Sequence, residues 1–123
     1  MSDQNKLVNA IQLLQRSIKW KPQKAALHLQ TRISYGHLPG TATLSDYEAI
    51  IQAIINDPLA DVYIYSWKTV KYPTIVSKQR GEVWLVMFSM DGVMETAFPP
   101  TFPDQYLTDI RFNYIDSLQE LIL

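Results

Sequence analysis

Apolar residues that recur every three or four positions predict an N-terminal helix over residues 2–18. The residues that form this stripe are Leu7, Ile11, Leu14 and Ile18. This spacing places them on one face of an α-helix, as is typical of a helix that packs on a core. Ser2 is predicted to cap the helix, because a serine side chain accepts a hydrogen bond from the backbone of the first turn. Pro22 marks the break that follows, since the residue before a proline disfavours helix.

Over residues 25–35 the chain alternates between positions expected to be buried and positions expected to be exposed. This alternation predicts a strand with one buried face. The residues of the expected buried face are Ala25, Leu27, Leu29, Thr31, Ile33 and Tyr35. His28 and Arg32 lie on the opposite face, about 13 Å apart along such a strand. In a helix, the same spacing would bring these two residues within one turn. In a strand and in a helix alike, His28 and Arg32 therefore point to the same side of the element.

A second helix is predicted over residues 45–55, and it ends at Asn56-Asp57-Pro58. Ser45 and Glu48 have the spacing of a capping box, in which each side chain bonds the backbone of the other residue. The apolar residues that this helix is expected to bury are Tyr47, Ile50, Ile51, Ile54 and Ile55.

The second half of the chain has the pattern of an antiparallel meander. Strands are predicted at residues 62–67, 72–77, 82–89 and 93–98, with a further edge strand at 112–115. Residues 82–89 are nearly all apolar, so this strand is expected at the centre of the sheet, covered on both faces. Asp91-Gly92 predicts a two-residue hairpin turn. The order of helix, strand, helix and then a meander of three to five strands predicts a single α+β domain over residues 1–123.

Composition narrows the class of protein. Of the 123 residues, 47% are hydrophobic and 19% are charged, which is a globular balance. The absence of cysteine excludes disulfides, thiolate nucleophiles and cysteine-based metal sites. The apolar runs are shorter than a membrane span, and the N-terminus lacks the layout of a signal peptide. A cytoplasmic protein that does not bind membranes is therefore expected.

The net charge of −1 conceals an uneven distribution. Residues 1–37 are strongly basic, and residues 67–81 hold four basic residues and no acid. If the two blocks meet in space, they form a positive face suited to an RNA backbone. Lys71, Lys78 and Arg80 are the candidate substrate-binding residues. The alternative is that both blocks are solvated surface.

His28 and His37 are the only histidines, and no other side chain is expected to titrate near neutral pH without perturbation. Arg32 lies between them and is suited to holding a phosphate. RNA cleavage needs a base, an acid and cations, but neither a metal nor a cofactor. Metal-binding and glycine-rich phosphate motifs are absent, so no metal or cofactor is expected. In the alternative interpretation, His28 is a surface residue and His37 orders its own turn.

Three segments resemble one family of ribonucleases. They are His28-x-x-x-Arg32, the capped helix that ends in Asn56-Asp57-Pro58, and the strands Trp84-Leu-Val-Met-Phe and Asp91-Gly-Val-Met-Glu-Thr96. Over residues 25–98 the chain is similar to small members of the barnase–EndoU–colicin–RelE group, which are compact α+β ribonuclease domains found among toxins and phage-borne proteins. The resemblance implies a site made by His28, Arg32 and Thr96, with His37 as an additional candidate.

Three classes of function follow. The first is a metal-independent ribonuclease-like domain that acts on RNA. The second is a non-enzymatic module that binds a cognate protein, such as an immunity or regulatory partner, motivated by the acidic residues 82–123 and by the many aromatic side chains. Binding of a small ligand is a third class. An enzyme should gather His28, Arg32 and His37 around a shared concavity, whereas an interaction module should scatter them.

Overall fold

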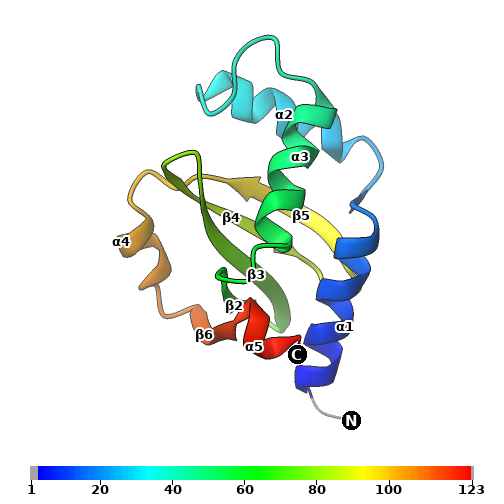
Figure 1. Cartoon of the computed structure of the whole chain (residues 1–123), viewed down its shortest axis with the longest axis vertical. Coiled ribbons are helices and arrows are strands. Elements are labelled where there is room, and N and C mark those ends of the chain that lie inside the picture. The colour runs from blue at the N-terminus through cyan, green and yellow to red at the C-terminus, as the bar shows by residue number, and fades with distance from the viewer. Residues whose placement is uncertain (1–2, 123) are drawn as a thin grey trace.

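A computed structural model describes residues 3–122 and has an α+β fold built on one six-stranded sheet (Figure 1). The helices are α1 (Asp3–Arg16), α2 (Lys24–Ser34), α3 (Leu44–Ile55), α4 (Pro103–Leu107) and α5 (Leu118–Leu121). The strands are β1 (Lys19–Trp20), β2 (Asp61–Trp67), β3 (Val70–Gln79), β4 (Glu82–Phe88), β5 (Val93–Phe98) and β6 (Phe112–Ser117). Their order in the sheet is β1-β5-β4-β3-β2-β6. Strands β2 to β5 form the predicted antiparallel meander, which confirms the α+β class.

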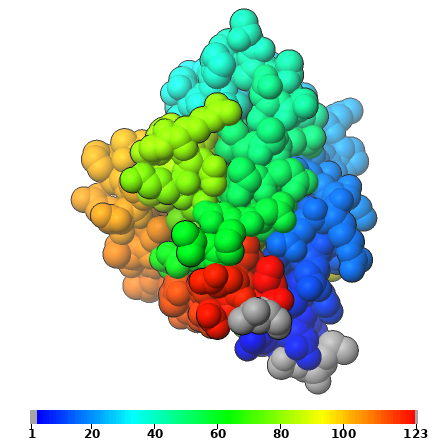
Figure 2. Space-filling model, viewed as in Figure 1, coloured from blue at the N-terminus to red at the C-terminus, as the bar shows by residue number. Residues whose placement is uncertain are grey.

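One face of the sheet is covered by α1 and α3, and residues of α1, α3 and α5 form a continuous surface on that side (Figures 1 and 2). Helix α1 buries Leu7, Ile11 and Leu14 as predicted, together with Ala10, but it ends at Arg16. The predicted cap at Ser2 lies outside the described residues. The core between these helices and the sheet contains the largest buried side chains, among them Tyr47 and Phe88.

Helix α3 buries all five predicted residues, but its cap differs from the prediction. Thr43 is the N-cap: its Oγ1 accepts a hydrogen bond from the Asp46 backbone at 3.2 Å, and Asp46 Oδ2 accepts one from the Thr43 backbone at 2.9 Å. The predicted Ser45–Glu48 box is therefore wrong, because the Thr43–Asp46 pair satisfies the same geometry two residues earlier. Glu48 instead accepts a hydrogen bond from Trp20 Nε1 at 2.9 Å.

Residues 24–34 form helix α2, so the strand predicted over residues 25–35 is wrong. The buried positions within α2 are Leu29 and Arg32, with Ala25 and His28 partly buried. These four positions form a stripe at helical spacing, while Leu27 is 57% exposed. Alanine, leucine, glutamine and arginine all favour helix, and the apparent alternation arose because Leu27 was counted with the buried face.

The predicted strands are confirmed, with bounds that differ by a few residues. Strand β4 is covered on both faces: Trp84 and Phe88 enter the helix-covered core, and Leu85 and Met87 lie in a smaller core on the outer face. The β4–β5 turn has three residues instead of two. Ser89 and Val93 close it, and Gly92 adopts a left-handed φ of +79°.

Residues 99–111 cross the outer face of the sheet from β5 to the distant edge strand β6, and this crossing segment contains α4. Tyr106 of α4 packs against Phe98 and Phe112, with ring centroids 5.6 and 5.5 Å apart. These contacts cover one part of the outer face. The part between the crossing segment and α2 is hollowed.

Candidate functional site

A groove of about 630 Å³ lies on the outer face of the sheet, and we call it the His28 groove. Met87 of β4 and Met94 of β5 contribute to its floor. His28 lines the groove from α2, and Arg111 lines it from the crossing segment. The groove therefore combines residues from the sheet, from α2 and from the crossing segment.

Three cations line the His28 groove: Lys21, Lys24 and Arg111. Lys21 Nζ pairs with Glu95 Oε1 at 2.9 Å. Arg111 is held by two hydrogen bonds to Asp109, of 2.9 Å from Nε and 2.6 Å from Nη2. These two cations are partly neutralised by acidic partners, whereas no ion pair of Lys24 is present within residues 3–122.

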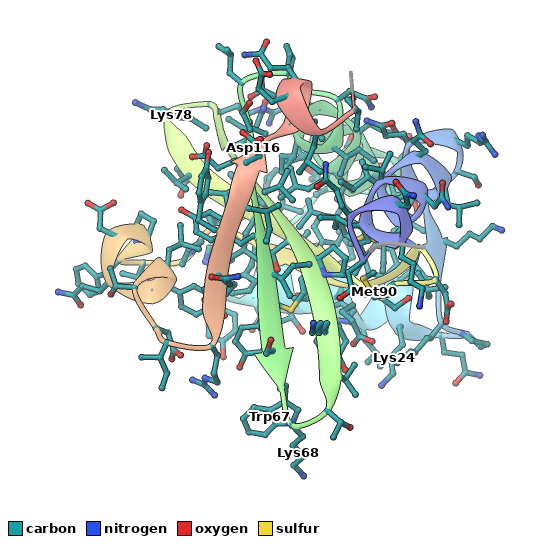
Figure 3. All side chains as sticks on the ribbon, turned by 90° about the horizontal axis from the view of Figure 1, so that it is seen from below. Lys24, Trp67, Lys68, Lys78, Met90 and Asp116 are labelled. Carbon is teal, nitrogen blue, oxygen red and sulfur yellow. The ribbon has the colours of Figure 1, made fainter. Side chains whose placement is uncertain are left out.

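Three aromatic side chains, Tyr65, Trp67 and Tyr72, also line this groove. The guanidinium of Arg111 lies 5.4 Å from the ring centroid of Tyr65 and 5.5 Å from that of Trp67. Trp67 is 46% exposed. It lies at the tip of the β2–β3 hairpin, on the same side of the molecule as Lys24 (Figure 3). Such rings offer flat apolar faces next to positive charge.

A bulge in β5 directs two neighbouring residues into the same groove. Thr96 pairs with Met87 and Met94 pairs with Phe88, so Glu95 between them has no partner on β4. In a regular strand Glu95 and Thr96 would point to opposite faces, but both line the His28 groove.

A smaller hollow of about 310 Å³ is lined by Arg32, His37, Tyr35, Phe98 and Thr96, and we call it the Arg32 hollow. Thr96 lines both this hollow and the His28 groove. The predicted catalytic residues thus lie around two adjoining depressions. These residues are His28, Arg32, His37 and Thr96. His28 lines only the groove, and Arg32 and His37 line only the hollow.

Arg32 is a buried cation with few partners, and it is only 7% exposed. Its Nη1 lies 3.0 Å from His37 Nδ1, and its Nε has no hydrogen-bond partner. The guanidinium lies 5.3 Å from the ring centroid of Phe98 and 5.7 Å from that of Tyr35. No described carboxylate forms an ion pair with it. Burial of a charge without a counter-ion is costly, so this guanidinium is well suited to receive an anion.

The end of α2 explains how His37 reaches Arg32. The His37 N–H donates to the Arg32 carbonyl at 2.9 Å, and the Gly36 N–H donates to the Ile33 carbonyl at 3.0 Å. Gly36 has a left-handed φ of +75°. These are the features of a Schellman motif, which reverses the chain at the end of a helix. The reversal brings the His37 ring back beside the guanidinium.

Both histidines are held neutral by their surroundings. Burial, followed by the charge of Arg32, lowers the pKa of His28 below its ordinary value of 6.5. The same two causes lower the pKa of His37. Because Arg32 Nη1 can only donate, His37 Nδ1 is the acceptor of their hydrogen bond, and the proton of the neutral ring lies on Nε2.

The lowered histidine pKa values predict that stability falls as the pH decreases from 7.5 to 5. The unfolded chain takes up protons at its histidines near pH 6.5, whereas the folded chain does so only at lower pH. Protons therefore favour the unfolded state in this range. Urea unfolding at several pH values should show this slope, and the double variant His28→Gln/His37→Gln should lose most of it. A slope that persists in the double variant would show that the pH dependence does not come from the histidines. Glu120→Gln, which leaves both histidines in place, is the control and should keep the slope.

The three predicted substrate-binding residues do not line either depression. Lys71 borders a different pocket, where its Nζ lies 3.9 Å from Asp3 Oδ2. Arg80 lies in the β3–β4 turn with a φ of +54°. Lys78 lies at the end of the sheet opposite Trp67 (Figure 3). No basic side chain of the second block therefore lines the His28 groove with Lys21 and Lys24. The second block contributes only Trp67 and Tyr72 to it.

Sequence reasoning did not single out Lys21, Lys24, Glu95 and Arg111 as site residues. Lys21 and Lys24 belong to the basic block that precedes His28, which was a usable signal. In a regular strand Glu95 would face away from Thr96, and only the bulge changes its direction. Arg111 stands in an acidic stretch, and nothing in the sequence places it beside Trp67.

Comparison with known proteins gave no match. No family model, curated protein or solved structure is significantly similar to this chain. No helix within residues 3–122 is long and apolar enough to cross a membrane. In the same part of the chain, no group of three histidine, aspartate or glutamate side chains is arranged to hold a metal ion.

Proposed function

We propose that this protein is a ribonuclease-like domain that binds RNA in the His28 groove and cleaves it without a metal ion. The observation that carries the proposal is the meeting of a neutral histidine with three cations and three aromatic rings in one groove. The cations suit phosphates, and the rings suit unpaired bases. The resemblance of residues 25–98 to small α+β ribonucleases supports the same conclusion.

The proposed reaction is attack of a ribose 2′-oxygen on the neighbouring phosphorus. His28, kept neutral near pH 7 by its lowered pKa, accepts the proton of the 2′-hydroxyl. The 5′-oxygen leaves and takes a proton from the ammonium of Lys21 or Lys24. The products are a 2′,3′-cyclic phosphate and a 5′-hydroxyl. Arg111 and the Thr96 hydroxyl stabilise the added charge on the phosphorane oxygens.

The arrangement supports single-stranded RNA as the substrate. Tyr65, Trp67 and Tyr72 can stack on a base only when that base is not paired in a duplex. His37 lies outside the groove, so the proposal assigns it to the positioning of Arg32 and not to proton transfer.

The proposal is tested by incubating the full chain with a mixed pool of single-stranded RNA in the presence of EDTA. We expect cleavage products that carry 2′,3′-cyclic phosphate, detected by mass spectrometry. His28→Gln should lower the rate by roughly 10²–10⁴-fold. Gln30→Ala, an exposed position of the same helix, is the control and should cleave normally. An RNA pool that stays intact with the unmodified protein would refute the cleavage activity.

The second candidate is a module that binds a cognate protein partner. It is favoured by exposed apolar side chains of the crossing segment, where Ile110 is 98% exposed and Phe102 is 67% exposed. If this candidate is correct, RNA stays intact, and Ile110→Ser weakens a complex with a purified partner while His28→Gln leaves that complex unchanged.

A further inference from the structure

We propose that the Arg32 hollow is a second anion subsite, which binds the phosphate next to the one that reacts at His28. The inference rests on the proposed function in taking both phosphates to belong to one RNA chain. Its main observation is independent of that function: Arg32 is 7% exposed, lines the hollow, and has an Nε atom without a hydrogen-bond partner. A buried guanidinium without a counter-ion is stabilised by an anion that binds in the hollow and supplies the opposite charge.

The hydrogen-bonding groups of the hollow match a phosphate. The guanidinium lines the hollow, and its Nη2, which forms no hydrogen bond with the described residues, is a donor for a phosphate oxygen. His37 accepts from Arg32 through Nδ1, so the N–H of its neutral ring is at Nε2 and is a further donor. The Tyr35 ring stacks on His37 with centroids 5.8 Å apart, and Phe98 covers the guanidinium from another side. Because Arg32 is only 7% exposed, little water competes for its guanidinium, and a charge-assisted hydrogen bond is stronger there than in water.

The position of the hollow fits an adjacent phosphate of the same strand. His28 and Arg32 are four residues apart on α2, so they lie one helical turn apart, roughly 6 Å between their Cβ atoms. That span is comparable to the separation of neighbouring phosphates along a polynucleotide. Thr96 lines both the His28 groove and the Arg32 hollow, so the two depressions adjoin at this residue. A strand that follows α2 can therefore place successive phosphates at His28 and at Arg32.

Nucleotide binding tests the subsite without requiring cleavage. The full chain is titrated with adenosine 5′-monophosphate, adenosine 3′-monophosphate and adenosine 3′,5′-bisphosphate at one fixed salt concentration, and the dissociation constants are measured by NMR. We expect the bisphosphate to bind at least tenfold more tightly than either monophosphate, and the Arg32 Nε–H resonance to shift on its addition. In Arg32→Met this ratio should fall below threefold. If Arg32→Met does not fold, Arg32→Gln is used with the same expectation.

Arg16→Met is the matched control, because it removes one positive charge from the exposed last turn of α1 and should keep the tenfold ratio. The subsite is refuted if the unmodified protein shows a ratio near one, or if Arg32→Met keeps the full ratio. RNA cleavage together with a ratio near one would refute the subsite and leave the proposed function intact. Intact RNA together with an Arg32-dependent ratio would support the anion site and refute cleavage.

Discussion

Replacement of Arg32 by methionine is expected to raise the free energy of unfolding while weakening the binding of RNA. Replacement of buried ion pairs by apolar side chains of similar volume stabilises by about 1–4 kcal/mol in favourable cases, because the desolvation cost of the charges is removed. Methionine would remove the same kind of cost at Arg32. Arg32 is a favourable case because it is 7% exposed and no described carboxylate pairs with it. The lost charge-assisted hydrogen bonds should weaken RNA binding by on the order of 1.5–3 kcal/mol.

Urea unfolding at pH 7.5 and titration with a short fluorescent RNA measure the two effects on the same samples. Arg16→Met, which removes an exposed charge, should change each quantity only slightly. A guanidinium with a purely structural role gives the opposite result, in which Arg32→Met unfolds more easily and RNA binding stays unchanged. Opposite signs of the two changes are therefore evidence that the charge is kept for binding and not for stability.

Gly92→Ala is expected to destabilise the fold by about 2–5 kcal/mol, through two separate effects. Gly92 has a φ of +79°, and a left-handed conformation costs a non-glycine residue about 1–2 kcal/mol. An added Cβ would also lie 2.9 Å from Leu13 Cβ and 3.3 Å from the Ala10 carbonyl oxygen, both on α1. Such overpacking typically costs about 1–3 kcal/mol.

Gly36→Ala is the matched control for this prediction, because Gly36 has a similar φ of +75° and no atom within 4 Å of the added Cβ. Only the backbone cost of about 1–2 kcal/mol applies to it. Both variants are compared with the unmodified protein by urea unfolding. Equal losses in the two variants would show that α1 moves away from the hairpin at no cost and would contradict the close contact with Leu13.

The buried charge of Arg32 and the lowered pKa values of the histidines have one physical origin. Burial at the α2–β5 boundary disfavours each charged form, and the guanidinium adds repulsion to any proton on His28 or His37. In the proposed complex, a phosphate offsets only the repulsion, because its negative charge compensates the guanidinium. Burial remains and continues to favour the neutral form of both histidines.

The helices α1 and α3 and the meander β2–β5 were predictable from the sequence, because each depends on local periodicity. The spacing of Leu7, Ile11 and Leu14 fits a helix and does not fit the alternation of a strand. The hairpin at Gly92 joins strands that are neighbours along the chain. His28, Arg32 and His37 could be chosen as candidates for a related reason. Histidine and arginine have chemistry that can be recognised without a structure, and the spacing of His28 and Arg32 puts them on one side in either conformation.

Residues 25–35 show the limit of that reasoning, since their leucines and alanines fit both an alternating and a helical pattern, and packing decides between them. In the helical form, Leu29 joins the main core and Arg32 lies beside Phe98. The direction of Glu95 depends on a bulge whose register is set by β4, and no local pattern contains that information. Short-range periodicity and side-chain type are therefore sufficient to specify α1, α3, the meander and the kinds of chemical group in the chain. Local patterns could not show that Arg111 joins His28 in one groove or that Arg32 is buried without a counter-ion, because both depend on contacts between distant segments.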